Sequence, residues 1–163
     1  MALPNIPLNL PSRKSKNLIT HLGCLIAPFY KSDTVAPEGA AAKIGTDGET
    51  ITVAVPGSSA TGINGLFAQE VYDPSVLGEL AGYEFLNGTK VKIGDTIGLV
   101  TGQGYVLTKN YVGAISKGDK LYPAASGKLS ASRTSSDMSV GVAETAGEDG
   151  GALIRVRINF QLS

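Results

Sequence analysis

The chain has 163 residues and carries 14 lysines and arginines against 14 aspartates and glutamates, so its formal net charge is zero. This balance provides no overall field that would attract nucleic acid or an anionic membrane, and we expect neither as a partner. The length suits one globular domain, and the single cysteine excludes a disulfide framework within the chain.

The first 38 residues differ in composition from the rest, because they hold five of the eight prolines but one of the 21 glycines. Proline fixes its own φ and biases the preceding residue toward extended backbone. We therefore expect an extended N-terminal arm over residues 1–38 and a β-barrel domain over residues 39–163. Apolar side chains on such an arm need a surface to cover, and its basic cluster either meets an acidic partner or forms a solvated hinge. The partner-binding candidates are Leu3, Ile6, Leu8, Leu10, Arg13, Lys14 and Lys16.

An apolar run follows this basic cluster at residues 18–29. It weakly matches a lipoprotein cleavage site at Cys24, but a secretory signal has its charges near the start and an uninterrupted apolar core, which His21 breaks. The run is also too short to span a bilayer. We interpret it as a buried strand or interface segment. His21 is expected to be a core or interface residue, since the chain has no second histidine to share a metal.

Most of the following sequence has the pattern of short β-strands. Residues 50–55 alternate between apolar and small or polar side chains, and turns such as Asp47-Gly48 and Gly118-Asp119 place glycine where a positive φ costs little. Short strands separated by about ten residues indicate a small β-barrel or sandwich of short antiparallel strands. Further strands are predicted at residues 91–93, 97–100, 105–107, 111–115, 120–122 and 140–143.

One short helix is predicted after residue 73. Asp73 suits the N-cap and Pro74 suits the first helical position, while Gly78 keeps the helix short. Residues 56–65 and 126–139 are rich in glycine and serine, so we expect surface loops there, either solvated connections or contact loops.

The clearest strand is the last, at residues 154–162, where apolar and polar residues alternate strictly. Arg155 and Arg157 therefore project to the same side and either pair with acids across strands or subunits or form a solvated face. Aromatic residues make up 6% of the chain, without tryptophan, which disfavours a stacking platform for sugars or single-stranded nucleic acid. We expect the larger aromatics in the core or at a subunit seam: Tyr105, Tyr111, Tyr122 and Phe160. The subunit-interface candidates are Tyr122, Arg155 and Arg157.

No motif in the sequence predicts catalysis or a cofactor. One cysteine and one histidine cannot assemble a zinc site within one chain, and a serine nucleophile would have only His21 as its base. The glycines at 102 and 104 are too few for a dinucleotide fingerprint, and no phosphate-binding loop is present. The acids at 144, 148 and 149 either surround a calcium ion or, as we favour, solubilise an exposed hairpin. We assign no catalytic, cofactor-binding or metal-binding residue.

The order of several segments resembles the capsid cement proteins, also called head-decoration proteins, of tailed bacteriophages. The similarity covers most of residues 39–162 and depends on the order of the segments more than on any one of them. These segments are GLFAQEVYD (65–73), KGDKLYP (117–123), GKL (127–129), VGVA (140–143) and ALIRVRI (152–158).

The resemblance implies a dimeric or trimeric β-barrel that binds outside an assembled head and bridges major capsid subunits, after synthesis in the host cytoplasm. It implies no catalytic residues. Two alternatives of other classes remain open. One is a non-catalytic ligand-binding or carrier-type β-barrel, and the other is an enzyme with a site between subunits, formed by residues such as Asp95, Asp119 and Tyr122.

Overall fold

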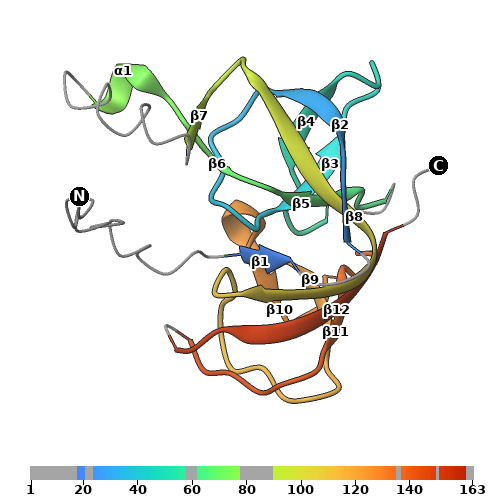
Figure 1. Cartoon of the computed structure of the whole chain (residues 1–163). Helices are drawn as coiled ribbons and strands as arrows, with labels where there is room; N and C mark the ends of the chain where they lie inside the picture. Colours follow the sequence, from blue (N-terminus) through green and yellow to red (C-terminus); the bar gives the residue numbers. More distant parts are fainter. Residues whose placement is uncertain are drawn as a thin grey trace, which may run out of the picture.

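The structure is a computed structural model, and it describes residues 18–20, 24–57, 62–77, 90–134, 137–149 and 151–160. These residues form mainly β-strands (Figure 1), which confirms the predicted all-β class. The strands are β1 (Leu18–Thr20), β2 (Cys24–Ser32), β3 (Ala41–Ile44), β4 (Thr50–Val53), β5 (Gly65–Phe67), β6 (Glu70–Tyr72), β7 (Lys90–Lys92), β8 (Thr96–Thr108), β9 (Lys120–Pro123), β10 (Leu129–Ser130), β11 (Gly141–Ala143) and β12 (Ile154–Phe160).

The predicted short helix is also confirmed, as α1 (Pro74–Leu77). Asp73 caps it: its Oδ1 accepts hydrogen bonds from the Ser75 hydroxyl at 2.7 Å and from the Ser75 backbone N–H at 2.9 Å. These bonds lower the pKa of the Asp73 carboxyl, because they stabilise its ionised form.

Strand β8, with 13 residues, pairs with strands in both halves of the molecule. One edge pairs with β1 and β2, and the pairs from Leu18↔Thr108 to Ala27↔Leu99 keep one register. The other edge pairs first with β5 and then with β12. The strand therefore belongs to two halves of the chain, visible above and below one another in Figure 1. We call them the first lobe (β2 to β7 with the start of β8) and the second lobe (β1 and β9 to β12 with the end of β8).

The first lobe is a closed barrel in the order β8-β2-β4-β3-β5, because β5 returns to pair with β8. Closure leaves no free sheet edge within this ring. All its pairs are antiparallel except β2 with β4, and a separate parallel pair, β6 with β7, lies beside the barrel. Its buried core consists of Ala36, Ala40, Ala42, Ile51, Phe67, Val71, Ile97 and Leu99.

Part of the segment that we predicted as an arm belongs to the sheet, because β1 and β2 both pair with β8. Two of the five prolines that suggested an arm, Pro28 and Pro37, lie in the body. Pro28 lies where the pairing of β2 with β8 shifts register between Ala27 and Tyr30, and a bulge is one of the few sheet positions that tolerate a residue without an N–H. Pro37 lies in a turn, where its carbonyl accepts the N–H of Ala40 at 3.1 Å.

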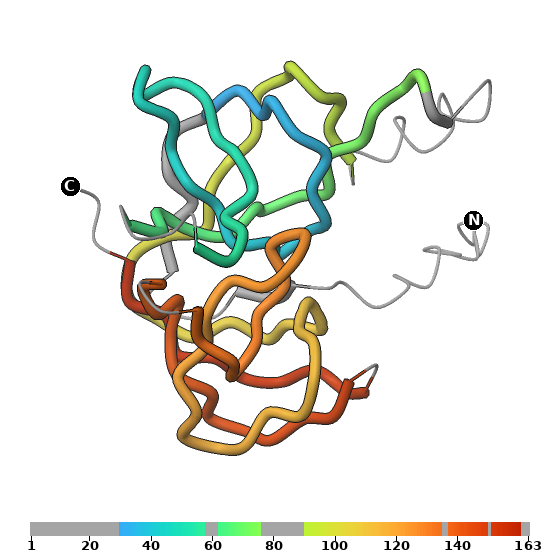
Figure 2. The backbone as a smooth tube through the Cα atoms, turned by 180° about the vertical axis from the view of Figure 1, so that it is seen from behind, coloured from blue at the N-terminus to red at the C-terminus, as the bar shows by residue number. Residues whose placement is uncertain are grey.

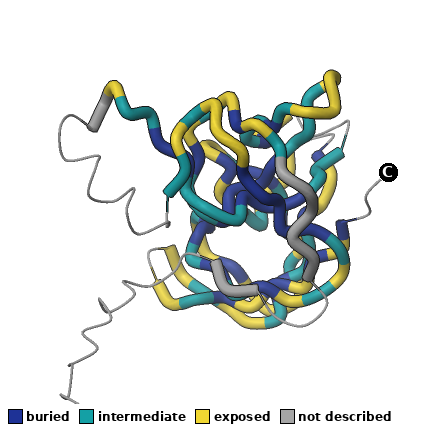
Figure 3. The backbone as a smooth tube through the Cα atoms, turned by 45° about the horizontal axis from the view of Figure 1, so that its top comes forward, coloured by how far each residue is buried: buried dark blue, intermediate teal, exposed yellow. Residues whose placement is uncertain are grey.

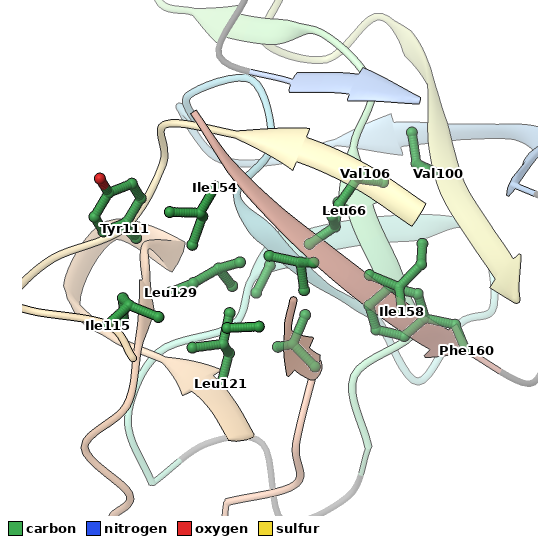
Figure 4. Close-up of a cluster of buried hydrophobic side chains, with 14 of the residues drawn as sticks. Leu66, Val100, Val106, Tyr111, Ile115, Leu121, Leu129, Ile154, Ile158 and Phe160 are labelled. Carbon is green, nitrogen blue, oxygen red and sulfur yellow. The ribbon is translucent and has the colours of Figure 1, made fainter. Parts of the chain in front are cut away.

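The second lobe is a sheet in the order β1-β8-β12-β11-β9-β10. In β12 the residues alternate between buried and exposed along the whole strand, as predicted. The inward residues of this sheet form a core, shown in Figure 4, with side chains from its own strands and from β5. The larger members of this core are Leu66, Val100, Val106, Tyr111, Ile115, Leu121, Leu129, Val140, Ile154, Val156, Ile158 and Phe160.

The two lobes contact each other near β5, and we call this contact the seam. A short 3₁₀ turn at Ala125–Gly127 reaches the first lobe (Figure 2, orange), and Asp137 Oδ1 accepts the backbone N–H of Gly57 at 2.9 Å. Leu66 of β5 is fully buried within the core of the second lobe. Figure 3 shows buried stretches in the interior of both lobes and exposed residues mainly on the outer turns. The body is therefore one packed unit.

Two strand predictions need correction. Residues 97–100 and 105–107 are not separate strands, because β8 continues through the intervening residues, which pair with β2 and β12. Residues 111–115 form no strand but two isolated bridges, Tyr111↔Leu129 and Ile115↔Gly147. Gly113 interrupts the segment with a φ of 77°, outside the range of extended backbone.

Tyr111 anchors the connection between β11 and β12. Its ring is buried, and its hydroxyl lies 2.8 Å from the carbonyl oxygen of Glu148 and 3.0 Å from that of Ala152, so it donates to this pair of carbonyls. Burial raises the pKa of the Tyr111 phenol, and the negative charges of Asp149 and Glu148 raise it further. The neutral phenol is therefore the form that stabilises the folded protein.

Replacing Tyr111 with phenylalanine should lower the free energy of unfolding by about 1–2 kcal/mol near neutral pH, because it removes the donor to those carbonyls. In the unfolded chain the phenol ionises near pH 10 and in the folded protein at higher pH, so wild-type stability should fall as the pH rises above about 10. Urea unfolding at pH 8 and at pH 10.5 measures both effects. The variant should lose less stability between these two pH values, and equal losses would contradict the assignment.

Candidate functional site

The outward side of the second-lobe sheet carries the described residues that we predicted for an interface. Ile154, Val156 and Ile158 point into the core, so the alternate residues Arg155 and Arg157 point outward and are exposed. This confirms that the two arginines share one side of the strand. Their Cα atoms are about 7 Å apart by strand geometry.

A row of four residues crosses the sheet on this side. In the pairing register Arg157 lies opposite Tyr105 of β8 and opposite Val142 of β11, and Val142 lies opposite Lys120 of β9. Tyr105 is 40% exposed and Lys120 is exposed, whereas Val142 is half-buried. We call this surface the outer face, made of Tyr105, Lys120, Tyr122, Arg133, Val142, Glu144, Arg155 and Arg157.

Two arginines of the outer face lie against tyrosine rings. The guanidinium carbon of Arg155 is 5.9 Å from the ring centre of Tyr105, and that of Arg133 is 5.6 Å from the ring centre of Tyr122. Both distances allow a cation–π attraction, of about 0.5–1 kcal/mol at exposed sites. Arg133 is held in addition by a hydrogen bond, which its Nε–H donates to the carbonyl oxygen of Asp137 at 3.2 Å.

The acid of the outer face is Glu144, whose Oε1 lies 3.4 Å from Nε of Arg157. The Arg157 side chain is 57% exposed, so the pair contributes little stability. Lys120, Arg133 and Arg155 face the same side, so cations outnumber acids on this surface although the whole chain is neutral. The outer face is therefore a local positive patch.

The structure brings the three subunit-interface candidates onto this one sheet. Tyr122 is half-buried under Arg133, and Arg155 and Arg157 follow two strands away. The other aromatics divide between environments: Tyr111 and Phe160 are buried in the core, whereas Tyr105 is at the surface. The predicted partner-binding residues of the arm lie outside the described residues; they are Leu3, Ile6, Leu8, Leu10, Arg13, Lys14 and Lys16.

Sequence reasoning made no assignment for Lys120 or Arg133. It had placed Tyr105 in the core or at a subunit interface and Glu144 on an exposed hairpin. The alternation of buried and outward residues in β9 offered a signal for Lys120, since it lies two positions before Tyr122. Arg133 follows β10 in an irregular segment, and no local pattern places its side chain over a ring of β9.

Two acids that we considered for an enzyme site between subunits, Asp95 and Asp119, lie in different lobes of the chain. Asp95 belongs to the turn before β8 in the first lobe, and Asp119 belongs to the turn before β9, where its Oδ2 accepts the Ser116 N–H at 2.8 Å. Among the described residues, no group of three or more histidine, cysteine, aspartate or glutamate side chains is placed to hold a metal ion. In the same part of the chain no helix has the length and apolar character needed to cross a membrane.

No protein-family model matches the chain, and no curated protein matches its sequence. The function is therefore argued from the residues and their geometry.

Proposed function

We propose that this protein is a structural virion component that binds the outside of an assembled tailed-phage head and stabilises it by bridging major capsid subunits. It acts there as a homo-oligomer, a dimer or a trimer, and catalyses no reaction. The proposal starts from the resemblance of the sequence to head-decoration proteins.

The observation that carries the proposal is the way in which the resembling segments assemble. Residues 117–123, 127–129, 140–143 and 152–158 supply β9, β10, β11 and β12, which are neighbours in one sheet. Four of the five resembling segments therefore lie side by side in one sheet, whereas residues 65–73 form β5 and β6 in the first lobe. A sheet of this kind on a compact β-body suits a protein whose task is to lie against a lattice.

A decoration protein of this kind stabilises a head by mass action. A protein that binds the assembled lattice but not its separated subunits adds its binding free energy to the cost of taking the lattice apart. The arm suits the same task, because an extended apolar segment can add backbone hydrogen bonds to an exposed sheet edge while alternate side chains enter pockets. Burial of its four large apolar side chains contributes on the order of 6–10 kcal/mol before the entropic cost of ordering the arm.

Removing residues 1–17 should weaken binding to heads at least about tenfold while leaving the body folded, because the first described strand begins at Leu18. The measurement is occupancy on expanded heads assembled without the protein, determined by co-sedimentation over a range of protein concentrations. Thermal unfolding of the truncated chain provides the check on folding. Failure of the full chain to bind heads would refute the proposed function, whereas undiminished binding by the truncated chain would refute only the role of the arm.

A matched pair of arm variants separates apolar burial from mere length. The test variant replaces the apolar residues with serine, and the control replaces the neighbouring asparagines, so both keep the full arm and its charge. If apolar burial drives binding, the test variant should resemble the truncation and the control should resemble wild type. The test positions are Leu3, Ile6, Leu8 and Leu10, and the control positions are Asn5 and Asn9.

A further inference from the structure

The outer face presents more positive charge than its own residues neutralise. Arg157 has Glu144 at 3.4 Å, but Arg155 lies against the Tyr105 ring and Arg133 against the Tyr122 ring. The next acids along the chain are engaged elsewhere or lie beyond the sheet: Asp119 accepts the Ser116 N–H, and Glu148 and Asp149 lie in the connection anchored by Tyr111. Neighbouring cations on a strand repel one another, so a ligand that brings negative charge to this face gains binding energy.

The geometry of the arginines favours carboxylates over nucleic acid bases. A base that stacked on Tyr105 or Tyr122 would compete with an arginine, whose guanidinium carbon lies 5.9 Å or 5.6 Å from the ring centre. A guanidinium carries N–H donors in a planar fork that matches the two oxygens of a carboxylate. In Arg133 the Nε–H already donates to the carbonyl oxygen of Asp137 at 3.2 Å, so its terminal N–H groups would make this contact. The neutral chain also lacks the overall positive field that draws in a polyanionic strand.

We propose that the outer face docks onto an acidic surface of another protein, whose carboxylates pair with Arg155, Arg157, Lys120 and Arg133. Tyr105 and Tyr122 hold two of these arginines in place and contribute apolar contact area. Any partner with a matching acidic surface fits this description, whether or not the protein decorates a head. This contact is separate from the one proposed for the arm.

The test measures binding of a short, fluorescently labelled oligoglutamate to the full chain by fluorescence anisotropy. The variant Arg155→Ala/Arg157→Ala should raise the Kd about tenfold, since each exposed ion pair contributes up to about 1 kcal/mol. The matched control is Lys31→Ala/Lys92→Ala, which removes the same charge from exposed positions of the first lobe and should change the Kd less than about twofold. Raising the salt to about 0.3 M should weaken wild-type binding.

A second variant guards against loss of folding. Arg155→Lys/Arg157→Lys keeps the charge but loses the planar fork, so its Kd should lie between those of wild type and the alanine variant. If Lys31→Ala/Lys92→Ala weakened binding as much as Arg155→Ala/Arg157→Ala, the proposal would be overturned, because binding would then follow net charge alone. Tighter binding of a single-stranded oligonucleotide of equal charge through the same arginines would assign the face to nucleic acid. If the wild-type chain formed dimers that dissociated in the Arg155→Ala/Arg157→Ala variant, the outer face would be assigned to a second copy of this chain. Either the oligonucleotide result or the dimer result would refute docking onto another protein.

Discussion

Replacing Gly127 with alanine should lower the free energy of unfolding by about 3–4 kcal/mol, the largest single effect that we expect. Gly127 has a φ of 71°, a left-handed conformation that disfavours residues with a Cβ. A Cβ added there would lie 2.8 Å from Cβ of Ala40 and 2.8 Å from Cγ1 of Val53. Both neighbours belong to the first lobe, so the substitution would force the lobes apart at their seam.

The measurement is chemical and thermal unfolding of Gly127→Ala beside Gly48→Ala. Gly48 has nearly the same φ, 72°, but nothing lies within 4 Å of the position its Cβ would take. Gly48→Ala therefore has the cost of a left-handed backbone without a steric clash, and its free energy of unfolding should fall by about 1 kcal/mol. We expect the melting temperature of Gly127→Ala to fall by about 10 °C. Similar losses in the two variants would show that the seam tolerates a methyl group.

Replacing Gly141 with alanine should destabilise the protein by about 3 kcal/mol, because β11 packs too closely against β12 to admit a side chain. A Cβ at this position would overlap the carbonyl oxygen of Arg157 and lie 3.1 Å from Cγ1 of Val156. These atoms belong to the paired strand and to the buried core, so neither can move without disturbing the sheet. Displacement of β11 would also separate Lys120 from Arg157 on the outer face, because β11 lies between their strands.

The control for this prediction is Val142→Ala in the same strand. Val142 points outward and is half-buried, so its truncation should cost less than about 1 kcal/mol. Urea unfolding gives the stabilities, and the oligoglutamate assay reports whether the outer face has changed. A Gly141→Ala protein as stable as wild type would mean that β11 and β12 can separate at little cost.

The sequence by itself determined the features that depend on neighbouring residues. The alternation along residues 154–160 established β12, its buried side and the shared direction of Arg155 and Arg157. Asp73 followed by Pro74 established the position of α1. In each case the relevant physics lies within a few residues: the period of the strand, the proline φ and the capping hydrogen bond.

Only the tertiary structure decided which strands pair and which side chains are brought together on one surface. The composition of residues 1–38 suggested an arm, yet Pro28 lies in β2, where the register with β8 shifts. That register depends on residues some 70 positions away in the sequence. Arg133 reaches Tyr122 only because β10 turns back along β9. Local patterns predict that a segment is a strand and which of its sides is apolar. Strand pairing depends on packing between segments that are distant in the sequence, so the two lobes and the outer face could not be predicted from local patterns.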